Sequence, residues 1–130
     1  MIMEIYCIVC SRKKIETLRP VDSINLYLSP NIRNVYEMSK HDGVEFRILS
    51  GKFGLLAPHD KVERYDCLLK DDAVEGLVEK LKDQIRSQGI DMITFFAENR
   101  QEHPNWGPYY DAIIGACEDL GIRLERIEID

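Results

Sequence analysis

With 130 residues, of which 45% are hydrophobic, the chain is long enough to bury a core without disulfides or a structural metal. Its 17 basic and 23 acidic residues give a net charge of -6, which argues against a broad surface for duplex DNA, since such surfaces neutralise phosphates with lysine and arginine. We therefore expect one globular domain over residues 1–130, with at most a local basic loop.

The sequence contains no apolar run of about 18 residues and no secretory leader pattern, so we expect a cytoplasmic protein without membrane contact. Cys7 and Cys10 form one C-x-x-C pair, but within a strand this spacing points the two side chains to opposite faces. Cys67 and Cys117 are isolated in the sequence. Because zinc requires further ligands nearby, we expect buried, reduced thiols, no metal site and no cofactor.

The first half of the chain predicts a strand, a helix and a second strand. Residues 4–10 form a near-continuous apolar run, typical of a strand buried on both faces of a parallel sheet. Ser29 suits a helix N-cap and Pro30 the first helical position, so a helix is expected from there to Gly43. Residues 44–49 then predict the second strand.

The second half continues this alternation. Residues 73–88 place apolar side chains at helical spacing, residues 91–97 predict a buried third strand, and a third helix around Tyr110 ends at Gly121. Residues 122–129 predict a last strand, whose charged content suggests a sheet edge. This pattern predicts a single three-layer α/β domain, with a mainly parallel sheet of about four strands flanked by helices.

Polar clusters follow three of the predicted strands, where ligands of open α/β sheets bind. They are Cys10-Ser11-Arg12-Lys13-Lys14, Ser50-Gly51-Lys52 and Glu98-Asn99-Arg100-Gln101-Glu102-His103. Because the carboxyl ends of parallel strands meet at one edge of a sheet, we expect Lys14, Ser50, Lys52 and Glu98 to share that edge.

Two glycines bracket the second cluster, since Gly51 and Gly54 enclose Lys52. Each frees the backbone for a positive φ or for close approach to a ligand. The segment matches neither a P-loop nor the dinucleotide-binding G-x-G-x-x-G pattern, which disfavours ATP and NAD as ligands.

Two side-chain types in these regions suit a nucleotide. Lys14 and Lys52, expected at exposed positions, suit contact with phosphate. Trp106, Tyr109 and Tyr110 suit stacking on a base, although aromatic residues at a helix start also pack in cores.

The same residues carry a family resemblance. Cys10-Ser11-x-x-Lys14 is followed by Tyr27-x-Ser29, then by Leu49-Ser50-x-Lys52-x-Gly54-Leu55, Pro58 and Tyr65-Asp66. This succession resembles the small bacterial and phage domains related to the YaaA family, which is associated with DNA binding under oxidative stress. The first element is also similar to one in archaeosine synthase and related transglycosylase domains, which handle deazaguanine bases and have been likened to the uracil-DNA glycosylase fold.

Residues and resemblance together suggest an enzyme that acts on the N-glycosidic bond of a nucleobase, free, in a nucleotide or in nucleic acid. The expected catalytic residues are Lys14, Glu98 and Asp66, of which the two carboxylates would stabilise an oxocarbenium-like transition state or activate water. The expected substrate-binding residues are Cys10, Ser11, Tyr27, Ser29, Ser50, Gly51, Lys52, Gly54, Tyr65, Asn99 and Tyr110.

Two other functions remain open. A non-catalytic module could recognise a nucleotide or DNA through the same pocket, and a stress-linked protein could act through partner contacts at its acidic surface. Binding without turnover would distinguish the first alternative from the enzyme.

Overall fold

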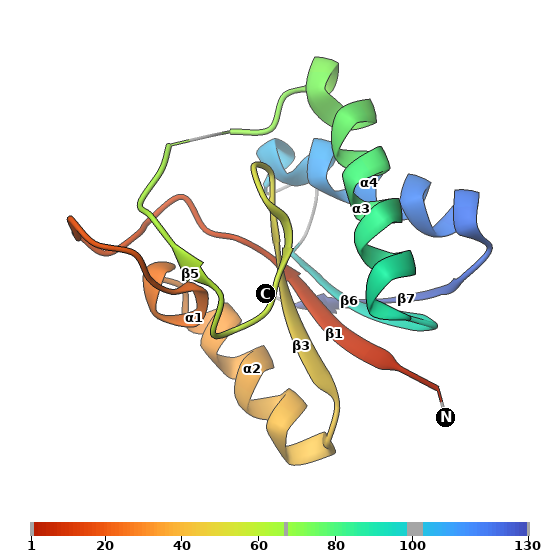
Figure 1. The fold of residues 1–130 in the computed structure, drawn as a ribbon, viewed down its shortest axis with the longest axis horizontal. Helices are drawn as coiled ribbons and strands as arrows, with labels where there is room; N and C mark the ends of the chain where they lie inside the picture. Colours follow the sequence, from red (N-terminus) through yellow and green to blue (C-terminus); the bar gives the residue numbers. More distant parts are fainter. Residues whose placement is uncertain (1, 67, 99–102, 130) are drawn as a thin grey trace.

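A five-stranded sheet runs through the molecule in the order β4-β3-β1-β6-β7 (Figure 1). The computed structural model describes residues 2–66, 68–98 and 103–129. The strands are β1 (Glu4–Val9), β3 (Glu45–Ser50), β4 (Gly54–Leu56), β6 (Met92–Glu98) and β7 (Arg123–Ile129). All neighbouring pairs are parallel except β3 and β4, which are antiparallel. The predicted α/β class with a mainly parallel sheet is confirmed.

β1 is the central strand of this sheet. Ile5 is paired with Glu45 of β3 on one side and with Ile93 of β6 on the other. Ile5 and Cys7 have no exposed surface, as the apolar run predicts for a strand covered on both faces. β7, in contrast, lies at an edge and leaves Ile127 exposed, in agreement with its charged sequence.

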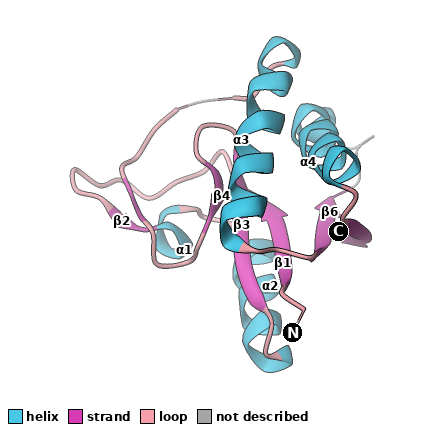
Figure 2. Cartoon of the chain, turned by 45° about the vertical axis from the view of Figure 1, so that its right-hand side comes forward, coloured by secondary structure: helices cyan, strands magenta, loops and turns pink. Residues whose placement is uncertain are grey.

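Helices cover both faces of the sheet. Successive side chains of β1 point to opposite faces and meet different helices. The Tyr6 hydroxyl donates to Asp42 of α2 (Pro30–Asp42) at 2.6 Å. Cys7, the next residue, faces Cys117 of α4 (Gly107–Leu120). α3 (Val74–Gln88) lies beside α4 (Figure 2). Within the described residues, none of the helices combines the length and apolar character needed to cross a bilayer.

The start and end of α2 follow the sequence signals. Ser29 Oγ accepts a hydrogen bond from the amide of Ile32 at 3.3 Å, and Pro30 occupies the first helical position. Gly43 ends the helix in the left-handed conformation, with φ 69°.

The prediction of about four strands was too low, because the shortest elements carry no periodic pattern. Gly54 adopts φ 74°, so the chain reverses and Leu55 pairs with Leu49 across the β3–β4 ladder. A second, two-stranded sheet joins β2 (Val21–Asp22) and β5 (Lys61–Val62). The remaining short elements are α1 (Ser23–Leu26) and the 3-10 turns η1 (Asp71–Ala73) and η2 (Pro104–Trp106).

Candidate functional site

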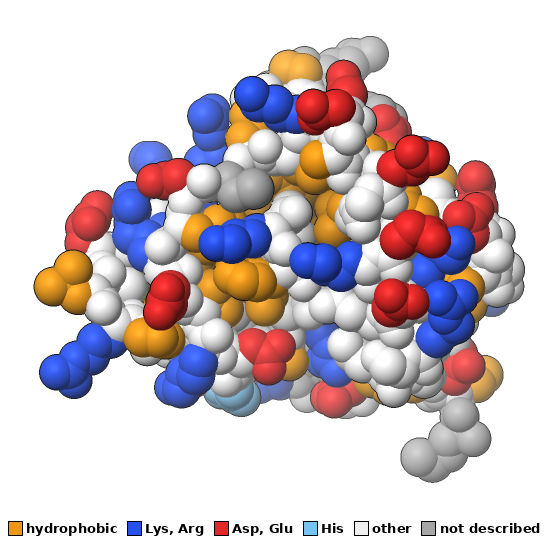
Figure 3. Space-filling model, turned by 45° about the horizontal axis from the view of Figure 1, so that its top comes forward, with side chains coloured by type: hydrophobic (Ala, Val, Ile, Leu, Met, Phe, Trp, Pro, Cys, Tyr) orange, Lys and Arg blue, Asp and Glu red, His pale blue; other side chains and the backbone are white. Residues whose placement is uncertain are grey.

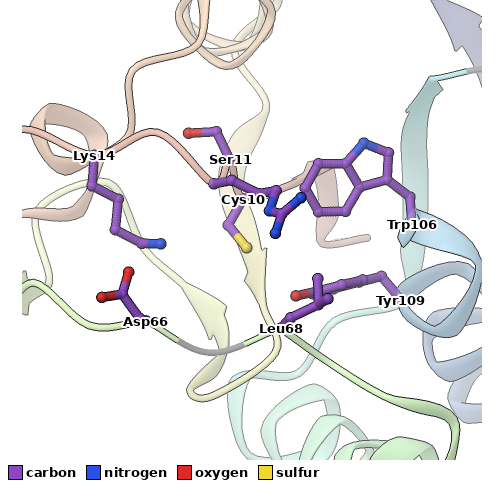
Figure 4. A pocket seen from close by; sticks show the side chains of 8 residues that line it. Cys10, Ser11, Lys14, Asp66, Leu68, Trp106 and Tyr109 are labelled. Carbon is purple, nitrogen blue, oxygen red and sulfur yellow. The ribbon is translucent and has the colours of Figure 1, made fainter. Parts of the chain in front are cut away.

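Two adjoining cavities open where β1, β3 and β6 end. The larger has a volume of about 250 Å³ and is lined by Cys10, Ser11, Arg12, Lys14, Asp66, Leu68, Trp106 and Tyr109 (Figure 4). The smaller has a volume of about 30 Å³ and is lined by Ile8, Val9, Cys10, Ser11, Ser29, Phe96, Glu98, Trp106 and Tyr110. Cys10, Ser11 and Trp106 therefore form the wall between the two cavities.

Lys14 is the principal cation of the larger cavity, and it is buried rather than exposed as expected. Its side chain is 9% exposed, because its backbone bridges to Tyr27 and this places it over two aromatic rings. The ammonium nitrogen lies 4.6 Å from the centre of the Tyr65 ring and 5.7 Å from that of Tyr27. Among the described residues it has no hydrogen bond or ion pair. Figure 4 shows the ammonium directed into the cavity from the side opposite Trp106.

A chain of buried hydroxyl groups lies behind Lys14. Ser50 Oγ lies 2.7 Å from the Tyr65 hydroxyl, which lies 2.6 Å from that of Tyr27. Ser50 Oγ also accepts from the amides of Lys52 and Phe53, both at 3.1 Å, so its own proton goes to Tyr65. Burial raises the pKa of Tyr65 and of Tyr27 above the ordinary tyrosine value, so both remain protonated.

Cys10 ends β1 and brings a thiol to the wall of both cavities. Its amide donates to the carbonyl of Leu49 at 2.9 Å, which extends the β1–β3 ladder. Burial raises the pKa of the Cys10 thiol, although the amide of Gly51, the charge of Lys14 and the Tyr65 hydroxyl act in the opposite direction. The group is therefore a neutral thiol at pH 7 and a weak hydrogen-bonding partner for a ligand.

Glu98 belongs to the smaller cavity, where its carboxylate fixes other side chains. Oε1 accepts from the Asn31 amide and Oε2 from the Trp106 indole N–H, each at 3.2 Å. The nitrogen Nε2 of His103 lies 3.6 Å from Oε2, and the Tyr110 hydroxyl donates to the Glu98 backbone carbonyl at 2.6 Å. Glu98 thus attaches the aromatic wall of the site to β6.

Asp66 brings a carboxylate to the larger cavity. Its side chain is 84% exposed and lies 3.7 Å from the guanidinium of Arg64. Figure 4 places it on the same side of the cavity as Lys14. A water-accessible carboxylate of this kind can accept a proton from water or face a developing positive charge.

The turn between β3 and β4 lies beside the larger cavity. A Cβ atom on Gly51 would lie 3.1 Å from Tyr109, so Gly51 allows the turn to approach α4 closely. Lys52 is exposed, with its ammonium 5.6 Å from the centre of the Tyr65 ring. Gly54 lies against Gln84 of α3, whose carbonyl accepts from the amide of Leu55 at 2.8 Å.

The predicted site residues thus separate into groups around the carboxyl edge of the sheet. Cys10, Ser11, Lys14 and Asp66 line the larger cavity, and Ser29, Glu98 and Tyr110 line the smaller one. Tyr27, Ser50 and Tyr65 form the hydroxyl chain, and Gly51, Lys52 and Gly54 form the turn. Asn99 lies outside the described residues.

Sequence reasoning missed Leu68 and Asn31. Leu68 lines the larger cavity from the segment before η1, and Asn31 reaches Glu98 from the first turn of α2. Neither stands in a motif that could have revealed it. Within residues 2–66, 68–98 and 103–129, no group of three or more His, Cys, Asp or Glu side chains is arranged to hold a metal ion.

Comparison with known proteins identifies one family. Neither the curated proteins nor the solved structures contain a match to this chain. A family model described as a family of unknown function, DUF6884, matches residues 5–106. That stretch runs from β1 to η2 and includes Lys14, Asp66, Glu98 and Trp106. The chain therefore belongs to the DUF6884 family.

Proposed function

We propose that the protein is an enzyme that hydrolyses the N-glycosidic bond of a nucleobase, which can be a modified base, in a nucleotide or in DNA. The observation that carries this proposal is the arrangement of the larger cavity. Lys14 and Asp66 lie on one side of it, and the aromatic side chains of Trp106 and Tyr109 lie on the other (Figure 4).

The aromatic side suits the base. Trp106 and Tyr109 pack edge to face, with ring centres 5.4 Å apart, and the Trp106 indole is held by Glu98. Their positions are therefore set before a ligand arrives, which lowers the entropic cost of binding. Stacking on such side chains tolerates every base, so polar contacts from Ser11 and the neighbouring loops would provide selectivity.

The polar side suits the sugar and its reaction. As the bond between C1′ and the base nitrogen breaks, its electron pair leaves with the base and positive charge develops at C1′. Asp66 would stabilise that charge and accept a proton from the water that attacks C1′. One product is the sugar, which gains the hydroxyl group of that water at C1′. The other is the base, which takes up a proton at the nitrogen that the broken bond released. Lys14 would hold a phosphate or a developing anion.

The second candidate is a module that binds a nucleotide without changing it. One observation favours it: among the described lining residues of the larger cavity, Asp66 is the sole carboxylate. Glycoside hydrolysis generally uses two carboxyl groups, and Glu98 is engaged by Asn31 and Trp106 in the smaller cavity.

Incubation of the purified protein with nucleosides, nucleotides and phage DNAs, followed by mass spectrometry, separates the two candidates. Release of a free base that is lost in Asp66→Asn supports the enzyme. A shift in melting temperature without product supports the binding module. Release that is unchanged in Asp66→Asn would overturn the role of this carboxylate.

The relation to the YaaA family and the cytoplasmic location also belong to the proposal. The first rests on the Cys10-Ser11-x-x-Lys14 motif, whose lysine and cysteine both line the larger cavity. The second rests on sequence composition and on the unpaired cysteines Cys7, Cys10 and Cys117, which suit a reducing compartment.

A further inference from the structure

We infer that the ligand of the larger cavity is a nucleoside monophosphate, whose dianionic phosphate pairs with Lys14 and Arg12 and whose base lies against Trp106. This inference rests on the proposed function for the presence of a base. It adds the phosphate, the charge of that phosphate and the preference for a single free nucleotide.

The first step is the unmet charge of Lys14. Lys14 as a residue is nine-tenths buried, and a charged group held at such a position is costly unless an anion or several hydrogen bonds compensate it. The faces of the Tyr65 and Tyr27 rings compensate part of this cost, and the ammonium forms no ion pair with a carboxylate of the described residues. The group faces the cavity, so an anionic ligand there would complete its environment (Figure 4).

The second step is the charge balance of the cavity wall. Arg12 lines the same cavity as Lys14. Lys52 does not line it, but its ammonium lies over the same Tyr65 ring as that of Lys14 and adds positive charge beside the cavity. Asp66, the one carboxylate among the described residues of the wall, already has Arg64 as its ion-pair partner. Two or more positive charges favour a phosphate monoester, which carries close to two negative charges at pH 7 because its second pKa is about 6.

The third step is the shape of the cavity. Lys14 and the Trp106–Tyr109 wall lie on opposite sides, which matches a molecule with a phosphate at one end and an aromatic base at the other (Figure 4). Apolar side chains also lie in a hollow with Lys and Arg side chains beside them on the face drawn in Figure 3.

The size of the cavity and the net charge favour a free nucleotide over a strand. A volume of about 250 Å³ accommodates part of one nucleotide. The net charge of -6 repels a long polyanion outside the cavity.

Calorimetry with the full chain tests this inference. The ligands are 5′-AMP, 5′-GMP, 5′-CMP and 5′-UMP, the four matching nucleosides, and one oligonucleotide with and without a 5′-phosphate. We expect at least one monophosphate to bind about tenfold or more tightly than its nucleoside. Equal affinities, or tighter binding of the phosphorylated oligonucleotide than of any mononucleotide, would overturn the inference.

Matched variants assign the phosphate contact. Lys14→Met keeps the length of the side chain and removes its charge, so it should lose the preference for the monophosphate and keep the affinity for the nucleoside. Lys13→Met, an exposed neighbour in the same loop that does not line the cavity, should behave like the parent protein. A monophosphate preference that persists in Lys14→Met and in Arg12→Met would overturn the assignment.

Phosphorus NMR provides a readout that does not depend on turnover. Two neighbouring cations should lower the second pKa of the bound phosphate, and Lys14→Met should bring it back toward the value in solution. An unchanged pKa in the bound state would contradict the contact. Monophosphate binding supports this inference, and if no base is released from any of the nucleosides, nucleotides or phage DNAs, the hydrolase is overturned while the inference stands. Base release from nucleosides as fast as from monophosphates supports the hydrolase and overturns the inference of a phosphate contact.

Discussion

The ammonium nitrogen of Lys14 lies 4.6 Å from the centre of the Tyr65 ring and forms no ion pair with a carboxylate of the described residues. A lysine in this position is a cost to the folded protein that a ligand can offset. The stability of the ligand-free protein is therefore informative about the site.

Replacing Lys14 by Met should stabilise the ligand-free protein by about 1 kcal/mol, because an apolar side chain of similar length removes a buried charge without leaving a hole. Urea denaturation measures the change. Lys13→Met should alter the free energy of unfolding by less than about 0.5 kcal/mol, as is usual at exposed positions. Marked destabilisation of Lys14→Met would mean that the contacts of this ammonium within the protein, including those with the Tyr65 and Tyr27 rings, outweigh the cost of its burial.

Ser50→Ala should destabilise the protein more than Tyr27→Phe does. The first change leaves the amides of Lys52 and Phe53 without their acceptor and removes the donor to Tyr65, so we expect a loss of about 2 kcal/mol. The second removes one hydroxyl from the end of the chain and should cost about 1 kcal/mol. Chemical denaturation of both variants tests the order, and a larger loss in Tyr27→Phe would contradict the direction of the hydrogen bonds.

Trp106 is the one tryptophan of the chain, so its fluorescence reports on the aromatic wall directly. Glu98→Ala removes the acceptor of the indole N–H and should free the ring, with a red-shifted emission and faster quenching by acrylamide. Glu45→Ala, at the exposed start of β3, is the matched control and should leave the emission unchanged. An identical spectrum in both variants would show that Glu98 does not hold Trp106.

Stability should fall as the pH rises above 9, the ordinary pKa of a cysteine thiol. Burial raises the pKa of Cys7 and Cys10, and that of Cys117 to about 12, so the folded protein keeps protons that the unfolded chain releases. Above pH 9, each buried thiol lowers the free energy of unfolding by about 1.4 kcal/mol per pH unit, until the pH reaches its pKa in the folded protein. Cys117→Ala should show a shallower decline between pH 9 and 10.5 in denaturation curves. If the stability of Cys117→Ala fell with pH as steeply as that of the parent protein, groups other than Cys117 would be responsible for the decline.

Gly54→Val should destabilise the protein by about 2 kcal/mol or more, because a branched side chain disfavours the φ of 74° at this turn. Its Cβ would also clash with the Gln84 side-chain oxygen. Gly115→Ala in α4 is the control, since its Cβ makes an ordinary contact with Val78 at 3.4 Å. Thermal denaturation of the two variants measures the difference, and equal stability would mean that the turn relaxes.

The long elements could be predicted because their signals are local. The apolar run of β1 and the Ser29-Pro30 cap of α2 depend on neighbours in the sequence. β4 could not be predicted, because it has three residues and forms only when the turn at Gly54 returns the chain to β3.

The position of the cavity could be predicted from the sequence, but the burial of Lys14 within it could not. Parallel strands bring their carboxyl ends together, which located the loops of Lys14, Ser50 and Glu98 at one edge. The burial of Lys14 depends on Tyr65, whose hydroxyl is oriented by Ser50. Such a dependence between distant segments leaves no pattern in the sequence.

The two sides of the larger cavity are held by separate parts of the molecule. The backbone around Lys14 is tied to the segment before α2, with Ile15 bonded to Leu26 at 2.8 Å. Trp106 is attached to β6 through Glu98. The two sides meet at the start of α2, where Asn31 donates to Glu98. The start of α2 therefore couples the charged side of the cavity to its aromatic side, and a substitution there should alter the preference for the charged group of a ligand and the preference for its ring together.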